Sequence, residues 1–157
     1  MKNVVIDHHR HGVINLDTTE SQGNEAYIDG SAGPVLTMYG YYLLPEKETF
    51  IVKEAIKMTN NVTEWLALYT LILDLPEGWK GLVYSDSLLI VNQFNGEYQI
   101  KDLELKRIHD SSKVLYHQKN LSLKVVWVPR ERNILGKKLE RELEKEKRKR
   151  WMARNGK

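Results

Sequence analysis

The chain contains no cysteine, which excludes disulfide bonds and thiolate metal sites. It has only four prolines, and no apolar run is long enough to cross a membrane. The N-terminus also lacks the apolar core of a signal peptide. With 157 residues, the chain is long enough for one domain with a hydrophobic core. We therefore expect a cytoplasmic protein that makes no membrane contact and is a monomer.

The charges are unevenly distributed. Residues 1–100 hold 6 Lys or Arg against 13 Asp or Glu, whereas residues 101–157 hold 18 against 8. An acidic half of −7 beside a basic half of +10 suggests a polyanionic partner and a separate acidic centre that could hold cations. The alternative for the last twenty residues is a basic tail that only improves solubility.

A short apolar run that begins at Ala26 ends on a carboxylate. The residues from Ala26 to Asp29 predict a buried strand, and Gly30 and Ser31 break it. Strand-forming residues recur at 37–44 and 49–55, so we expect an antiparallel meander of three strands. A carboxylate in an apolar setting needs a partner, and a metal ion is one candidate for Asp29.

A helix is predicted next. Thr59, Asn60 and Asn61 supply N-cap side chains, and the apolar residues at 62–73 follow them. We expect Glu64 in the first turn of this helix, where a carboxylate also suits the helix dipole.

A second strand then delivers a carboxylate in the same way. Residues 82–85 are apolar and run directly into Asp86. Residues 101–120 predict one or two amphipathic helices with a break near Asp110. A strand at 121–128 and a final helix from about Asn133 complete the order of elements.

Asp29, Glu64 and Asp86 are thus predicted on rigid elements. Any one of them alone could be an ordinary strand-end or capping residue. Together they form a set of hard oxygen ligands, which suits Mg²⁺ or Mn²⁺. A pair of such ions can promote an in-line phosphodiester displacement.

The chain from about Glu25 to Leu143 resembles a type 1 ribonuclease H, of the compact archaeal-like or retroelement-like branch. Four motifs in the family's order carry the resemblance: Tyr27-Ile28-Asp29-Gly30-Ser31, Thr59-Asn60-Asn61-Val62-Thr63-Glu64, Tyr84-Ser85-Asp86-Ser87 and Val128-Pro129-Arg130-Glu131-Arg132-Asn133.

The resemblance implies an α/β ribonuclease H-like fold, with a five-stranded mixed sheet of three antiparallel strands and then parallel strands, flanked by helices. It implies a metal-dependent endoribonuclease that cleaves the RNA strand of RNA/DNA hybrids by two-metal-ion chemistry. In this family the residues that match Asp29, Glu64 and Asp86 hold the metal. The residues expected to contact substrate are Gly30, Ser31, Asn60, Asn61 and Asn133. The basic half would then hold phosphates.

The sequence departs from the family at one position. The family carries a fourth carboxylate four residues after the residue that matches Asn133, and here that position is Lys137. Glu140, one turn later, could reach the metals, or the Lys137 ammonium could replace the charge of one cation. The third alternative is a catalytically weak or silent module that binds RNA/DNA hybrids or double-stranded RNA.

Two further alternatives concern function. A DNA nuclease of the integrase or resolvase type shares the wider fold but usually lacks the Thr-Asn-Asn-x-x-Glu arrangement. The run Val5-Ile6-Asp7-His8-His9 also looks like one short motif of the DHH phosphoesterases, although the chain has no room for that fold. A weak metal site at His8, His9 and His11 is the remaining interpretation of this run.

These interpretations divide the chain into three parts. Residues 1–24 form an N-terminal extension, either a hairpin or an arm. Residues 25–143 form the ribonuclease H-like domain, and residues 144–157 form a basic helical tail.

Overall fold

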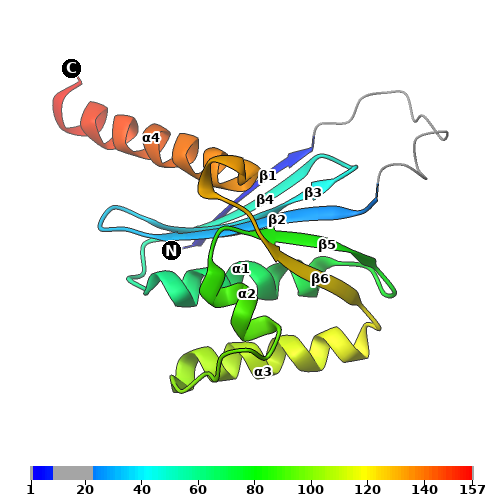
Figure 1. The fold of residues 1–157 in the computed structure, drawn as a ribbon. Helices are drawn as coiled ribbons and strands as arrows, with labels where there is room; N and C mark the ends of the chain where they lie inside the picture. Colours follow the sequence, from blue (N-terminus) through cyan, green and yellow to red (C-terminus); the bar gives the residue numbers. More distant parts are fainter. Residues whose placement is uncertain (1, 9–22, 157) are drawn as a thin grey trace.

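The computed structural model describes residues 2–8 and 23–156. A single six-stranded sheet organises these residues, and helices cover both of its faces (Figure 1). The elements in chain order are β1 (Lys2–His8), β2 (Glu25–Ala32), β3 (Thr37–Leu44), β4 (Glu48–Glu54), α1 (Asn60–Asp74), β5 (Lys80–Ser85), α2 (Leu88–Phe94), α3 (Leu103–Gln118), β6 (Ser122–Trp127), the 3₁₀ turn η2 (Arg130–Arg132) and α4 (Ile134–Asn155).

The strand order is β1-β4-β3-β2-β5-β6. Strands β2, β3 and β4 form the predicted antiparallel meander, and β5 and β6 join β2 in parallel. The predicted count of five strands was wrong by one, because β1 adds a sixth strand antiparallel to β4. Of the N-terminal extension predicted over residues 1–24 as a hairpin or an arm, residues 9–22 lie outside the described residues, and with them His9 and His11.

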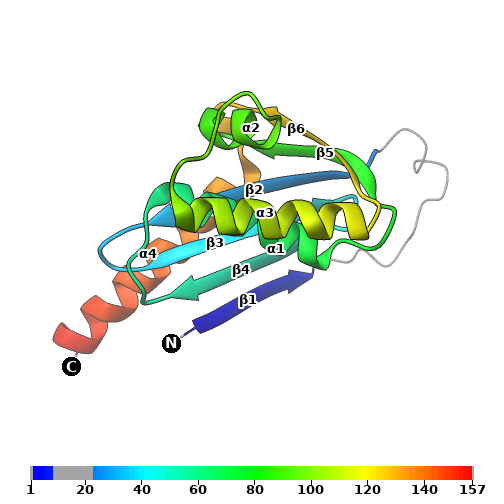
Figure 2. The same ribbon diagram turned by 90° about the horizontal axis from the view of Figure 1, so that it is seen from below.

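Two apolar clusters hold the layers together. The larger one lies between the sheet and the helices α1, α2 and α3, and Trp65, Leu68 and Leu71 at its centre have no exposed surface. The smaller one lies between the sheet and α4, around Met38, which is also fully buried, and Leu139. Each large apolar side chain buried in this way contributes about 1.5–3 kcal/mol relative to exposure. Figure 2 shows α1 and α3 crossing one face of the sheet while α4 lies behind it.

α3 is continuous, so the break predicted near Asp110 is absent from it. Ser112, in the polar stretch that suggested the break, is fully buried, and its hydroxyl donates to the Ile108 carbonyl. A serine more often favours turns, but this one fits within the helix because its hydroxyl donates to a carbonyl of the same helix.

α4 runs without interruption through residues 143 and 144, where the domain was predicted to end and the basic tail to begin. That division stays a prediction. None of the helices in the described part of the chain is long and apolar enough to span a membrane.

Candidate active site

The carboxylates of Asp29, Glu64 and Asp86 gather at one edge of the sheet. Each offers an oxygen atom, and these three oxygens lie within 4.8 Å of one another. Asp29 is in β2 and Asp86 directly follows β5. Since β2 and β5 are parallel neighbours, their carboxyl ends lie at the same edge. The three residues predicted to act together are therefore brought together.

Glu64 enters this group from α1 because of a close approach between helix and strand. A Cβ atom built on Gly30 would lie 2.5 Å from the Thr63 carbonyl carbon and 2.7 Å from the Glu64 nitrogen. Only glycine fits this contact, so Gly30 positions the backbone of Glu64. Glu64 was predicted in the first turn, but Thr59 is the N-cap and α1 has no acidic residue in that turn. Glu64 lies one turn further in, where the helix dipole contributes less.

Asn133 holds Asp86 and α4 in place. Its amide nitrogen donates to the Ile28 carbonyl at 2.9 Å and to Asp86 Oδ2 at 3.3 Å. Its oxygen caps α4 by accepting from the backbone N–H groups of Leu135 and Gly136. Asn133 has no exposed surface. Its predicted contact with substrate stays a prediction; in the structure the side chain is buried and its hydrogen bonds position Asp86 and α4.

Burial and nearby charges shift the acidity of Asp29 and Glu64. Burial, followed by repulsion from Asp86, raises the pKa of Asp29 from 3.8 to about 7, against lowering contributions from the Gly30 N–H and the charge of Arg130. Burial also raises the pKa of Glu64 from 4.5 to about 7, while a hydrogen bond from Ser87 and the charge of Arg130 lower it. Ionised together in this setting, the carboxylates destabilise one another unless a cation joins them.

Arg130 is the cation near this group that sequence reasoning missed. It is exposed, it belongs to η2, and its charge acts on both Asp29 and Glu64. The available signal was its place directly after Pro129, in the turn that follows β6. Because β6 lies beside β5, this turn emerges at the edge of the sheet that carries Asp86.

Lys137 and Glu140 lie on α4 beyond the buried first turn. Both are exposed. Glu140 is not in the group of three carboxylates, and neither residue is among the charges that act on Asp29 and Glu64. Gly136 is the α4 residue next to Asp29, since a Cβ built on it would lie 3.1 Å from Asp29 Oδ2.

The remaining predicted substrate contacts lie near the carboxylates, in the last residues of β2 and the first residues of α1. Gly30, Ser31 and Asn61 are half-buried, and Asn60 is exposed. The Asn60 side chain accepts a hydrogen bond from the Ala32 N–H at 3.1 Å, which ties α1 to the end of β2. Their contacts with substrate stay predictions.

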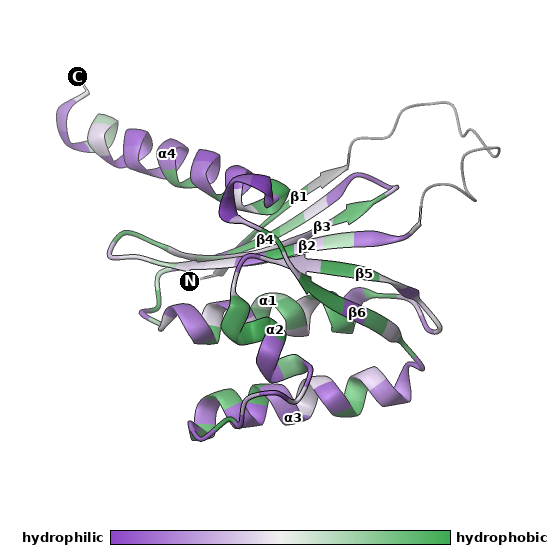
Figure 3. Ribbon diagram, viewed as in Figure 1, coloured by the Kyte–Doolittle hydropathy of each residue, from purple (hydrophilic) through white to green (hydrophobic). Residues whose placement is uncertain are grey.

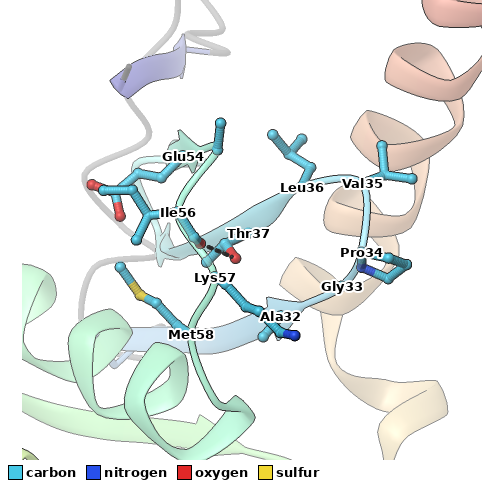
Figure 4. A pocket seen from close by; sticks show the side chains of 11 residues that line it. Ala32, Gly33, Pro34, Val35, Leu36, Thr37, Glu54, Ile56, Lys57 and Met58 are labelled. Atoms are coloured by element: carbon cyan, nitrogen blue, oxygen red, sulfur yellow. Dashed lines mark hydrogen bonds between the residues drawn. The ribbon is translucent and has the colours of Figure 1, made fainter.

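A pocket of about 480 Å³ lies next to this edge, between the β2–β3 turn and the segment that leads from β4 to α1 (Figure 4). Ala32 and Met58 are part of its lining, and Thr37 donates a hydrogen bond to the Ile56 carbonyl across it. The pocket contains none of the three carboxylates, so it is separate from the candidate active site.

Solved structures of RNase H1 proteins and domains are similar to this chain. No protein-family model matches the chain. LC11-RNase H1, which was crystallised in complex with an RNA/DNA hybrid, is 27% identical with a TM-score of 0.63, over 74% of this chain and 92% of that chain. The N-terminal RNase H domain of Rv2228c from Mycobacterium tuberculosis is 25% identical with a TM-score of 0.59, over 71% of this chain and 86% of that chain.

This chain has the ribonuclease H fold. RNase H1 from the halophilic archaeon Halobacterium salinarum shares that fold at 21% identity, with a TM-score of 0.57 over 70% of this chain and 88% of that chain. The predicted fold class is thus confirmed, with the extra strand β1. The predicted resemblance is confirmed as structural similarity to RNase H1 domains, whereas the assignment to a branch stays a prediction.

Proposed function

We propose that this protein is a metal-dependent endoribonuclease that hydrolyses the RNA strand of RNA/DNA hybrids. The observation that carries the proposal is the group of three carboxylates within 4.8 Å, two supplied by the parallel neighbours β2 and β5 and one by α1. The likeness to LC11-RNase H1, a protein crystallised with such a hybrid, supports the choice of substrate.

The donor set of this chain fits a divalent cation. Asp29, Glu64 and Asp86 present only carboxylate oxygens, which are the ligands that Mg²⁺ and Mn²⁺ prefer. Burial, and then repulsion from Asp86, raises the pKa values of Asp29 and Glu64, and a cation held between the carboxylates would offset both costs. When bound, such cations supply activation of water and stabilisation of negative charge on the phosphate and leaving oxygen.

The residues around the carboxylates hold the carboxylate oxygens in place for binding a cation. Asn133 fixes one oxygen of Asp86, and the Gly30 N–H fixes Oδ1 of Asp29 at 2.9 Å. The positive charge of Arg130 faces the same group and attracts a phosphate toward it. Ser31, Asn60 and Asn61 flank the site and suit contacts with the wide minor groove and the 2′-hydroxyls of an A-like duplex.

The test is a substrate panel measured with Mg²⁺ and with Mn²⁺. The panel contains a labelled RNA/DNA hybrid, double-stranded RNA, duplex DNA and branched DNA. We expect cleavage of the RNA strand of the hybrid, and its loss in Asp86→Asn but not in the control Asp110→Asn, an exposed carboxylate on α3. Equal rates for the wild type and Asp86→Asn would sink the enzyme proposal, and preferred cleavage of branched DNA would favour a resolvase-type nuclease.

The second candidate function is a silent module that binds hybrids or double-stranded RNA. The observation that favours it is Lys137, which stands where the family carries its fourth carboxylate. This candidate predicts salt-sensitive binding without turnover. Lys137→Asp separates the two: cleavage that arises only in this variant supports the silent module, whereas cleavage by the wild type that changes little supports a working site of three carboxylates.

A further inference from the structure

The outer end of α4 carries a concentrated positive charge. Residues 147–154 contain five Lys or Arg and no Asp or Glu. All eight residues are exposed, and Figure 3 shows this part of α4 as largely hydrophilic. The core stripe of the helix ends before it, since Leu139 is buried and Leu143 half-buried. This segment is therefore not needed to cover the sheet.

Three of these cations lie on the side of α4 that faces the carboxylates. Gly136 marks that side, because its backbone lies against Asp29. At 3.6 residues per turn, Arg154 follows Gly136 by five full turns, and Lys147 and Arg150 follow it by 11 and 14 residues, within about 40° of the same side. We call Lys147, Arg150 and Arg154 the terminal cation cluster.

A hydrogen bond fixes the direction of this cluster independently. Arg150 Nη2 donates to the Val35 carbonyl at 3.0 Å. Val35 belongs to the turn between β2 and β3, which begins just after Asp29, Gly30 and Ser31. The cluster thus lies beyond the same turn that borders the candidate active site, and Figure 1 shows the outer half of α4 passing over that turn.

Carboxylates of the protein neutralise the cluster only weakly. Lys147 Nζ lies 3.9 Å from Glu144 and Arg150 Nε lies 3.5 Å from Glu146, and both cations are about half exposed. Exposed pairs of this kind contribute at most about 1 kcal/mol. Arg154 makes no ion pair of 4 Å or less with any residue that the structure describes. The charge remains available to a partner.

We propose that the terminal cation cluster binds backbone phosphates of the same nucleic-acid duplex whose cleaved strand lies at the three carboxylates. This inference rests on the proposed function for the identity of the duplex. At 1.5 Å per residue, the cluster lies about 16–27 Å along α4 from Gly136, which corresponds to about 5–8 nucleotides at 3.4 Å per phosphate of one strand. A nucleic acid is the partner that fits this spacing, because a duplex held at the three carboxylates and running along α4 would present a phosphate about every 3.4 Å of each strand.

The experiment measures binding by the full chain, with EDTA present so that no strand is cleaved. A fluorescent 18-base-pair hybrid is titrated at salt concentrations from 50 to 200 mM, with wild type and with the triple variant Lys147→Gln, Arg150→Gln, Arg154→Gln. Loss of three phosphate contacts should reduce the slope of log affinity against log salt by about 2–3. A hybrid with only three base pairs on the α4 side of the cleaved phosphate should show no difference between the two proteins, because it ends before the cluster.

The matched control is a second triple variant with the same loss of charge on the same helix. Arg141, Lys145 and Lys149 are exposed and follow Gly136 by 5, 9 and 13 residues, which places them within about 40° of the opposite side of α4. Changing these three to Gln should leave the slope within about one of the wild-type value. The double variant Lys147→Gln, Arg154→Gln keeps the bond from Arg150 to Val35 and should still lower the slope by about 1–2.

Three results would overturn the inference. Equal losses of slope in both triple variants would mean that only net charge matters, and an unchanged slope in the double variant would mean that the cluster is merely solvated. Binding to phosphatidylserine vesicles that the first triple variant abolishes, with hybrid binding intact, would assign the cluster to a lipid surface. Because binding is measured without metal, the proposed nuclease activity and the proposed phosphate binding can fail separately. If the wild type cleaves no substrate, the triple variant should still show the predicted loss of slope.

Discussion

The two ends of α4 differ in almost every physical respect. At its start, Asn133, Leu135 and Gly136 are buried, and Asn133 is hydrogen-bonded to Ile28 and Asp86. At its outer end, residues 147–154 are exposed and carry five cations. A buried and hydrogen-bonded end suits chemistry that needs fixed groups, whereas an exposed cationic end suits phosphate binding, which tolerates movement. The following predictions test that division.

The largest effect is expected at the buried end. Asp29→Asn removes a ligand oxygen's charge and should lower cleavage of the hybrid at least about 100-fold. The same change should stabilise the metal-free protein at pH 8 by on the order of 1 kcal/mol, because it removes a buried charge that repels Asp86. Chemical denaturation in EDTA and a cleavage assay check both parts. A variant that is both active and less stable would contradict the division.

Loss of the Asn133 side chain should come next. Asn133→Ala removes the cap of α4 and the bond to Asp86, and should lower cleavage by about 10–100-fold and stability by about 1 kcal/mol or more. Asp102 is the matched control, because its side chain caps α3 by accepting from Leu105 at 3.0 Å, away from the carboxylates. Asp102→Ala should lose similar stability and keep its activity. Equal activities of the two variants at a temperature where both are folded would show that Asn133 only caps a helix.

Gly30→Ala tests the contact that positions Glu64. The added methyl group would meet the backbone of Thr63 at 2.5 Å, so we expect a loss of about 1–3 kcal/mol and weaker binding of Mn²⁺ as Glu64 is displaced. Gly33→Ala is the control, since its Cβ would lie 3.6 Å from the nearest atom, an ordinary contact. Urea denaturation and calorimetric titration with Mn²⁺ measure the two effects. Unchanged Mn²⁺ affinity in folded Gly30→Ala would separate Glu64 from the cation site.

The last prediction concerns pH and changes no residue of the wild type. The folded-state pKa values of Asp29 and Glu64 are raised to about 7, while in the unfolded chain they stay near 3.8 and 4.5. The folded state therefore binds more protons between these values. Without metal, stability should be highest below about pH 4 as far as these two groups are concerned, and should fall as pH rises toward and through 7, by about 3 kcal/mol per group at 1.36 kcal/mol per pKa unit.

Divalent cations should reverse this trend, because they replace the protons. Thermal denaturation at pH 5, 6, 7 and 8 with EDTA or MgCl₂ measures it, and the stabilisation by Mg²⁺ should grow with pH. The Asp29→Asn variant should show a flatter dependence in EDTA. A wild-type profile that is flat in EDTA, with equal effects of Mg²⁺ at pH 5 and pH 8, would contradict the assignment.

The sequence was sufficient for the parts of the site that depend on local pattern. Asp29 and Asp86 follow short apolar runs, and a strand that leads to a carboxylate can be read from such a run. The break predicted at Gly30 and Ser31 was wrong, because β2 continues through both residues to Ala32 as it pairs with β3. The closeness of Asp29 and Asp86 follows once β2 and β5 are parallel neighbours, because parallel strands place equivalent ends at one edge. Glu64 was assigned to the right helix but one turn too early, since Thr59 and not a later Asn caps it.

The parts that escaped prediction depend on contacts between distant segments. The apolar run in β1 reveals a strand but not its partner, so its pairing with β4 could not be foreseen. Asn133 has the side chain of a helix cap, but nothing local shows that Ile28 and Asp86 come within reach of it. Nothing in the local sequence distinguishes Arg130 from the other cations of the chain. Only the fold shows that η2 brings its charge to Asp29 and Glu64.

The most direct test of the central claim is a crystal structure of the protein soaked with Mn²⁺, located by its anomalous signal. The account predicts an anomalous peak that is coordinated jointly by Asp29, Glu64 and Asp86, and the loss of that peak in Asp86→Asn. A peak bound elsewhere, or the three carboxylates without any peak at saturating Mn²⁺, would contradict it.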